Sequence, residues 1–247
     1  GEQIIVTYTD ANRSSIIEAK KITNTNVNSV GNVGTSRIEI YSLADVAGAD
    51  KDGAITLSGL TEMQVITTSL VSGFDARGNA LSQTIDKTYY DDAGEATDYE
   101  TQAITNDAFN IHDRTTRSVI STYSGQAKEF TDTQEIKYVS YDRYGNATEQ
   151  TIDTFDDVNM IPSSLVSHKR ILNEYTDPVA RKRGNATVST VTEYKAASEI
   201  QANLVQQTVT TTTLFDVKGN AVDQTTNKSV ANAAGTLLLA NRTVVHN

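Results

Sequence analysis

The sequence predicts an all-β fold, a repetitive antiparallel array of β-hairpins that forms an extended or spiral ribbon. A phrase of the form aromatic-Asp-x-x-Gly-Asn-Ala recurs along the chain. Thr occurs 35 times in 247 residues, whereas Pro occurs twice. Apolar and polar residues alternate at period two in runs such as 135–141 and 207–215, which is the period of a strand. A β-solenoid is the alternative, because it also gives turns at a fixed period.

The recurring phrase predicts a tight turn. Its Asp can accept hydrogen bonds from backbone N–H groups two residues on, and Gly and Asn enter positive φ at the lowest cost. Two further copies are degraded: the copy at 180–186 lacks the aromatic residue and the Asp, and the copy at 107–110 lacks the Gly. The expected turn residues are Asp75, Gly78 and Asn79; Asp142, Gly145 and Asn146; Gly184 and Asn185; and Asp216, Gly219 and Asn220.

The spacing of the phrase predicts the repeat unit. Its glycines are separated by 67 residues (Gly78 to Gly145), then by 39 and by 35. The copy at 107–110 divides the first interval, so the unit is about 35 residues, enough for two strands and two turns. We therefore expect one continuous array over residues 1–247. The second turn of each unit differs between copies, as at 90–95 and 156–162, so one end of the hairpins should be constant and the other variable.

Composition excludes several classes of partner. The net charge of −10 argues against nucleic acid and anionic membranes, which need a concentrated basic surface. There is no Cys for disulfides, and no apolar run approaches the length of a membrane span, so membrane insertion is not expected. The chain starts and stops in strand-like runs without capping repeats. We expect a piece of a longer chain, or neighbouring copies that pair end to end.

The phrase from Phe74 to Ala221, followed by Thr-rich strands, resembles the Tyr-Asp or Rhs-type repeats of large secreted and cell-surface bacterial proteins. Those repeats are shorter, and a different residue follows their turn. These departures favour an open ribbon over a closed shell. The resemblance implies an extracellular or cell-surface location and a structural, adhesive or encapsulating role, and it carries over no catalytic residue.

One acidic loop is a candidate calcium site. In Asp50-Lys-Asp52-Gly53-Ala-Ile55, alternate carboxylates would converge as the chain turns, as in the middle of a calcium-binding loop. The first and twelfth positions of such a loop would be Gly48 and Gly59, which carry no carboxylate. A plain acidic turn is therefore the competing interpretation, and no other cofactor is expected.

Catalytic patterns are absent from the sequence. The paired carboxylates at 91–92 and 156–157 sit in variable turns, and His112, His168 and His246 share no spacing with a nucleophile. The chain is therefore expected not to be an enzyme. The aromatic residues beside the turns either stack inside the array or form an exposed strip for carbohydrate.

Two functions remain from the sequence. The first is a structural segment or subunit of a surface filament or giant repeat protein, with copies of itself as partners through addition of strands or hairpins. The alternative is an adhesin-type module that recognises surface glycans or a partner cell through its variable turns.

Overall fold

The computed structural model describes residues 1–9, 13, 15–47, 53–217 and 219–246. Asp50 and Asp52, on which the calcium hypothesis depends, lie outside the described residues. Calcium binding therefore stays a prediction.

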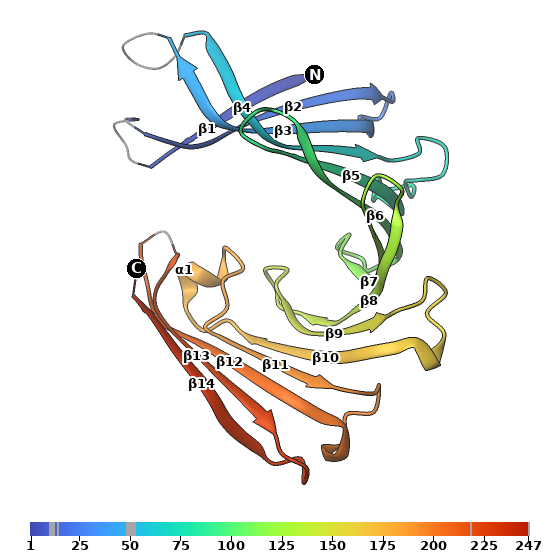
Figure 1. Ribbon diagram of the computed structural model, residues 1–247, viewed down its shortest axis with the longest axis vertical. Coiled ribbons are helices and arrows are strands. Elements are labelled where there is room, and N and C mark those ends of the chain that lie inside the picture. Colours follow the sequence, from blue (N-terminus) through green and yellow to red (C-terminus); the bar gives the residue numbers. More distant parts are fainter. Residues whose placement is uncertain (10–12, 14, 48–52, 218, 247) are drawn as a thin grey trace. The chain divides into compact units, whose positions relative to one another are not determined.

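The described residues form one open antiparallel sheet, in which the strands follow one another in chain order (Figure 1). This confirms the predicted hairpin array, and the solenoid alternative is not needed. The strands are β1 (Glu2–Tyr8), β2 (Ile16–Val27), β3 (Val33–Val46), β4 (Ile55–Thr67), β5 (Ser82–Tyr90), β6 (Ala96–Phe109), β7 (Thr115–Ser124), β8 (Glu129–Tyr141), β9 (Ala147–Phe155), β10 (Leu165–Glu174), β11 (Val188–Tyr194), β12 (Leu204–Phe215), β13 (Ala221–Ala231) and β14 (Leu237–His246).

The turn at Asp75 shows how the phrase folds. Asp75 N–H donates to the carbonyl of Asn79 (2.9 Å), and Gly78 N–H donates to the carbonyl of Asp75 (3.1 Å). Gly78 has a φ of 89°, the left-handed conformation that glycine adopts without a steric penalty. One carboxylate oxygen of Asp75 also accepts the N–H groups of Arg77 (2.8 Å) and Asn79 (2.9 Å). The phrase therefore closes a three-residue hairpin loop.

The role expected of the phrase Asn is corrected by the structure. Asn79, Asn146 and Asn220 are not among the described residues with positive φ. Each instead donates its side-chain amide to the second carboxylate oxygen of the Asp four residues earlier, at 2.9 to 3.0 Å. Glycine alone supplies the left-handed position, and the Asn closes the loop through its side chain.

The degraded copy at 180–186 is completed by a short helix. Asp177 accepts the N–H groups of Val179 (2.9 Å) and Ala180 (2.7 Å) and caps α1 (Pro178–Arg181), with Pro178 at its first position. One helical turn is therefore inserted between the Asp and Gly184. The other short helices are the 3₁₀ segments η1 (Pro162–Ser164) and η2 (Gln201–Asn203).

The same turn recurs outside the complete copies of the phrase. Asn28, Asn110 and Asn232 each accept two backbone N–H groups on the side-chain oxygen, two and four residues on. Asp91 does so as well, at the end of the hairpins expected to vary. At the 107–110 copy the capping residue is Asn110, and Asp113 takes the position of the Gly with a φ of 59°. Some hairpin turns at the end that was expected to vary therefore have the same hydrogen bonds as the phrase turns.

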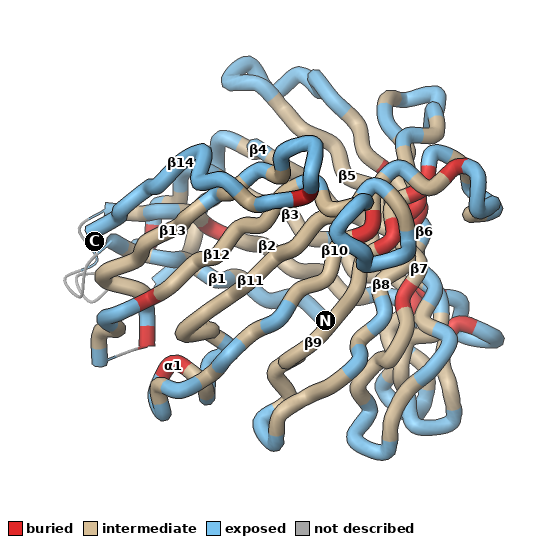
Figure 2. Tube along the Cα trace, turned by 90° about the horizontal axis from the view of Figure 1, so that it is seen from below, coloured by how far each residue is buried: buried red, intermediate tan, exposed pale blue. Residues whose placement is uncertain are grey.

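Few side chains are fully buried, as the small red regions of Figure 2 show. The buried apolar residues among those described are Ala19, Val46, Phe155 and Ala180. Half-buried side chains prevail along the strands. Stability in such a sheet comes mainly from backbone pairing and from contacts between side chains of neighbouring strands.

The chain divides into two compact units, one formed by residues 1–105 and 120–131 and the other by residues 106–119 and 132–247. Among the described residues, no helix has the length and apolar character to cross a membrane.

Candidate binding groove beside two hairpin turns

A β-bulge in β8 places two tyrosine rings together. Tyr138 lies opposite Gln150 of β9, but the register shifts on both sides of Ser140 before Tyr141 meets Ala147. Residues three apart in a regular strand point to opposite faces. Here the rings of Tyr138 and Tyr141 stack at a centroid distance of 5.8 Å and an angle of 20°. The bulge therefore brings both rings to one face of the sheet, as bulges near functional sites often do.

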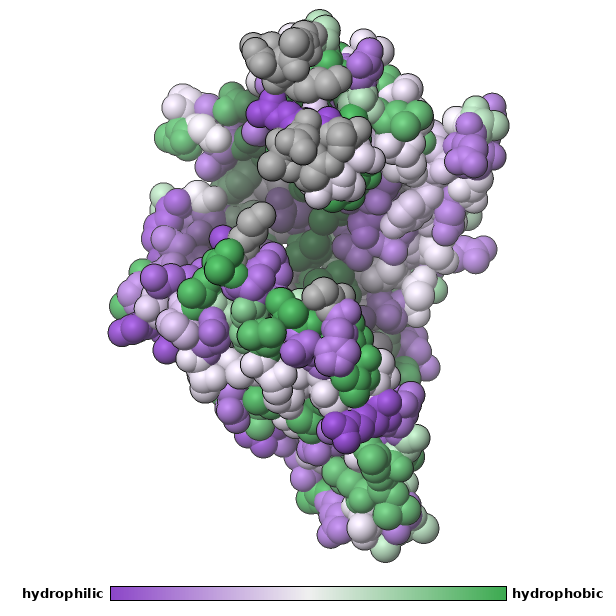
Figure 3. Space-filling model, turned by 90° about the vertical axis from the view of Figure 1, so that its left-hand side faces the viewer, coloured by the Kyte–Doolittle hydropathy of each residue, from purple (hydrophilic) through white to green (hydrophobic). Residues whose placement is uncertain are grey.

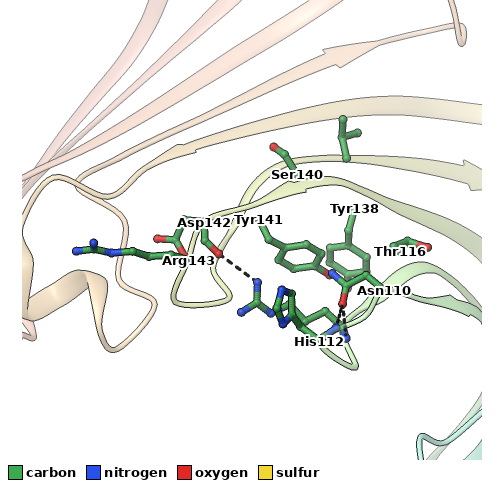
Figure 4. Close-up of a pocket in the computed structure, with 10 residues that line it drawn as sticks. Asn110, His112, Thr116, Tyr138, Ser140, Tyr141, Asp142 and Arg143 are labelled. Carbon is green, nitrogen blue, oxygen red and sulfur yellow. Dashed lines mark hydrogen bonds between the residues drawn. The ribbon is translucent and has the colours of Figure 1, made fainter.

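These rings line a groove of about 660 Å³, which lies within the second unit (Figure 4). One wall is the end of β8 and the turn that follows it, and the other is the turn between β6 and β7. In Figure 4 the two rings lie next to each other, with Asn110 and His112 on the same side. The lining residues are Asn110, His112, Arg114 and Thr116 from the β6–β7 hairpin and residues 138–143 from β8 and its turn.

Arg114 joins the two walls. Its guanidinium carbon lies 5.5 Å from the centre of the Tyr141 ring, and Nη1 donates to the carbonyl of Asp142 (3.1 Å). The Tyr141 hydroxyl donates in return to the carbonyl of Thr115. A cation over a tyrosine face is stabilising when partly desolvated. The groove is therefore held in place by contacts in both directions between its walls.

Asp142 anchors the turn at the rim of the groove. Its side chain is only 7% exposed and accepts hydrogen bonds from Arg181 Nε (2.9 Å) and from the N–H groups of Tyr144 and Asn146. Burial raises the pKa of this carboxyl, but the bonds from Arg181, the two N–H groups and the Asn146 amide outweigh burial and lower the pKa to about 2. Asp142 is therefore ionised near neutral pH, and Arg181 compensates its charge.

The tyrosines differ from solvated phenols. Burial raises the pKa of Tyr138, and burial followed by the neighbouring Tyr138 raises the pKa of Tyr141. Both hydroxyls are therefore neutral across the physiological range. The cationic side chains of the groove are Arg114 and Arg143.

A second groove repeats the arrangement further along the sheet. Its volume is about 450 Å³, and its lining includes Phe215, the aromatic residue of a later phrase. The register of β12 also shifts just before Phe215, as that of β8 does before Tyr141. The lining residues, Gly184, Asn185, Ala186, Ser189, Thr210, Thr212, Phe215, Asn220, Ala221 and Gln224, are all uncharged. A groove beside a phrase turn thus recurs, but its chemistry differs between repeats.

A buried histidine lies elsewhere in the second unit. His168, 5% exposed, has Nδ1 at 2.6 Å from Asp153 and Nε2 at 3.2 Å from Glu199. Both ring nitrogens face carboxylate oxygens, so neither is available as a general base for a substrate. We interpret this cluster as a structural link between β9, β10 and the loop before η2.

The turn residues predicted from the sequence do not form one site. They lie in separate hairpin loops, and the loops at Asp142 and Gly184 are brought into contact through Arg181 and Asn146. The carboxylates at 91–92 and 156–157 lie in other turns, and among the described residues no group of three or more His, Asp or Glu side chains is arranged to hold a metal ion.

Sequence reasoning missed Arg114, Tyr138 and the groove itself. The only available signal was the second aromatic residue three positions before the phrase, in Tyr138-Val-Ser-Tyr141.

No protein-family model and no curated protein matches the chain. Among solved structures, the chain is similar to a porin-like protein from Bacteroides uniformis with 13% sequence identity and a TM-score of 0.35, and the match covers 100% of this chain and 94% of that one.

Proposed function

We propose that this chain is a structural, non-catalytic segment of an extracellular or cell-surface protein whose sheet is lengthened by addition of further strands or hairpins. The observation that carries the proposal is the pairing of the sheet: within the described residues, β1 pairs only with β2 and β14 only with β13. Each of these strands presents a row of backbone N–H and C=O groups on its outer side, which is a template for another strand.

The direction of the strands favours continued addition. β14 pairs antiparallel with β13, so a further strand that pairs antiparallel with β14 runs in the direction of β13 and continues the alternation. A turn from β14 into such a strand lies at the same end of the sheet as the β12–β13 phrase turn. The added strand could belong to a longer chain or to a second copy.

β14 has few of the features that keep edge strands apart. Such strands are commonly short, or carry Lys, Pro or bulges. β14 is 10 residues long, contains one Arg and no Lys or Pro, and has a single register shift, opposite Lys228 and Ser229. Leu238, Leu239 and Val244 are 57%, 64% and 50% exposed. In Figure 3, apolar side chains gather at the lower end of the molecule, where the β13–β14 hairpin lies.

Contacts between successive phrase turns also support an additive sheet. Asn146 donates its amide to the carbonyl of Arg181 (2.7 Å), and Asn185 donates to the carbonyl of Gly219 (2.7 Å). The Asn of one phrase turn therefore binds the main chain of the next turn on the same end. This contact can be repeated with each added hairpin.

Sedimentation velocity and negative-stain electron microscopy of the 247-residue chain test the proposal. We expect concentration-dependent oligomers or ribbons. The double variant Leu239→Lys/Val244→Lys should weaken association by roughly tenfold or more, about 1.4 kcal/mol, because it places charges on the edge strand.

The matched control is Val166→Lys, which replaces a comparably exposed (58%) apolar side chain on β10, inside the sheet. It should leave association unchanged. A chain that stays monomeric at high concentration, or a control variant as disruptive as the edge variant, would contradict assembly through the edges.

A further inference from the structure

We propose that the groove beside Tyr138 and Tyr141 binds an acidic saccharide, a sugar that carries one carboxylate. This inference goes beyond the structural role and does not depend on it. Three features of the groove support it: a paired aromatic surface, a fixed cation at its border, and the absence of both from the second groove.

The aromatic surface suits the face of a sugar ring. The C–H groups on one face of a pyranose are weakly positive and pack against the electron-rich faces of aromatic rings. The rings of Tyr138 and Tyr141 are within 20° of parallel, and their hydroxyls are neutral. The bulge that pairs them also leaves Val139 59% exposed. The arrangement that pairs the two rings therefore exposes the apolar side chain of Val139 to solvent, which is unfavourable for folding alone.

The cation suits a carboxylate. Arg114 borders the Tyr141 ring, and a guanidinium has five N–H donors, of which the bond to the Asp142 carbonyl uses one. Arg143 also belongs to the lining, but its guanidinium lies 4.8 Å from the centre of the Tyr144 ring and donates to the Tyr144 hydroxyl (2.9 Å), so Arg114 is the cation beside the ring pair. The one carboxylate of the lining, Asp142, is paired with Arg181. Paired N–H donors of a guanidinium match the two oxygens of a carboxylate.

Net charge limits the size of the ligand. The chain carries −10, so a long polyanion would be repelled by the rest of the molecule although the groove itself is cationic. A single acidic sugar, or an acidic sugar at the end of a neutral glycan, avoids that repulsion. This separates the proposed ligand from nucleic acid and from polyuronates.

The second groove shows that these features are not required by the fold. It has the same position beside a phrase turn and the same shift of register before its aromatic residue, Phe215. It contains neither a second aromatic ring nor a charged side chain. The second groove therefore lacks the tyrosine pair and the cation, as expected if they serve binding rather than the framework of the sheet.

The test uses the 247-residue chain and three pairs of probes: the methyl glycosides of glucuronic acid, galacturonic acid and N-acetylneuraminic acid, each with a neutral counterpart in which the carboxylate is reduced to an alcohol. Saturation-transfer NMR and titration of backbone amide shifts report binding and its location. We expect at least one acidic probe to shift the amides of residues 110–116 and 138–143 and to bind about tenfold more tightly than its neutral counterpart.

Variants assign the roles. Tyr138→Ala should lower affinity for the acidic probe about tenfold, and Tyr138→Leu serves if the alanine variant does not fold. Arg114→Gln keeps a side-chain N–H near the Asp142 carbonyl, and it should remove the preference for the acidic over the neutral probe. Circular dichroism checks that each variant retains the sheet.

Two controls are matched to these variants. Lys137→Gln removes a positive charge from the strand that carries Tyr138. Lys137 is the neighbour of Tyr138, so its side chain lies on the opposite face of the sheet, where it is ion-paired with Glu135. Phe215→Ala removes the aromatic ring of the uncharged groove. Both should leave binding unchanged. The proposal is overturned if no acidic probe binds at up to roughly 50 mM, if acidic and neutral probes bind equally, or if the controls weaken binding as much as the groove variants.

Discussion

Arg181 Nε donates a 2.9 Å hydrogen bond to Oδ2 of Asp142, a residue 39 positions earlier in the chain. The Asn146 amide, from the turn of Asp142, donates in return to the Arg181 carbonyl at 2.7 Å. The guanidinium of Arg181 also lies 5.1 Å from the centre of the Tyr144 ring. Two consecutive phrase turns are thus joined by two reciprocal bonds, one between two side chains and one from a side chain to the main chain.

The Asp142–Arg181 pair predicts that an Asp→Asn substitution lowers the free energy of unfolding more at position 142 than at position 75. Asp142→Asn keeps the turn geometry, since Asn28 and Asn110 occupy the same position in other turns, but it removes the charge that faces Arg181. We expect a loss of about 1 to 3 kcal/mol in the free energy of unfolding, measured with urea. Asp75→Asn is the matched control, because its ion pair with Arg77 is longer (3.6 Å) and more exposed, and it should cost less than Asp142→Asn. Equal losses of unfolding free energy for the two variants would show that the ion pair with Arg181 does not stabilise the fold.

The same carboxyl predicts acid sensitivity. The folded-state pKa of Asp142 is about 2, below the ordinary value of 3.8, so this group stabilises the fold above pH 3.8 and the contribution is lost as the pH falls toward 2. The contribution is roughly 2 kcal/mol at neutral pH. Urea midpoints between pH 2 and pH 6 should fall more steeply for the native chain than for Asp142→Asn. Parallel curves for the two proteins would refute this assignment.

Glycine at the left-handed position of the Asp142 turn is required for two separate reasons. Gly145 has a φ of 94°, and a Cβ there would lie 3.1 Å from the Arg114 guanidinium. Gly94 has a φ of 81° with open space around it. We expect Gly94→Ala to cost about 1 kcal/mol through backbone strain alone, and Gly145→Ala to cost more and to disturb the groove. Thermal unfolding compares the two, and an equal shift would mean that Arg114 moves aside freely.

Two cross-strand His–Asp pairs should differ in strength. His168 faces Asp153 with side-chain exposures of 7% and 13%, whereas His246 faces Asp223 with exposures of 74% and 35%. His168→Ala leaves a buried carboxylate without this partner and should cost about 2 to 4 kcal/mol. His246→Ala should cost less than about 0.5 kcal/mol, because exposed pairs are screened by solvent. Urea unfolding of both variants checks the contrast, which fails if the two losses are alike.

The local part of the fold was predictable from sequence. The Asp75 turn depends on residues within five positions of one another, so its hydrogen bonds follow from residue type alone. The phrase search still missed the turn at Asn28, whose sequence Asn28-Ser-Val-Gly31-Asn32 differs from the phrase in having Asn for Asp, an aliphatic residue before it and Val instead of Ala after it. A search for an Asx residue three positions before a Gly would also have found the turns at Asp91 and Asn232.

The sequence alone specified the all-β class, the recurrence of turns at a fixed spacing and the positions of the phrase turns, because each depends on strand period and on contacts within one loop. It left a β-solenoid open beside the antiparallel order that the structure shows. Only the tertiary structure decided that Tyr138 and Tyr141 share a face, that Arg114 borders them, and that Arg181 binds Asp142. Those relationships depend on the register between strands, and a shift of one residue moves a side chain to the other face. Arg114 and Arg181 reach the Asp142 turn across 28 and 39 positions of the chain, so no single stretch of sequence specifies these contacts.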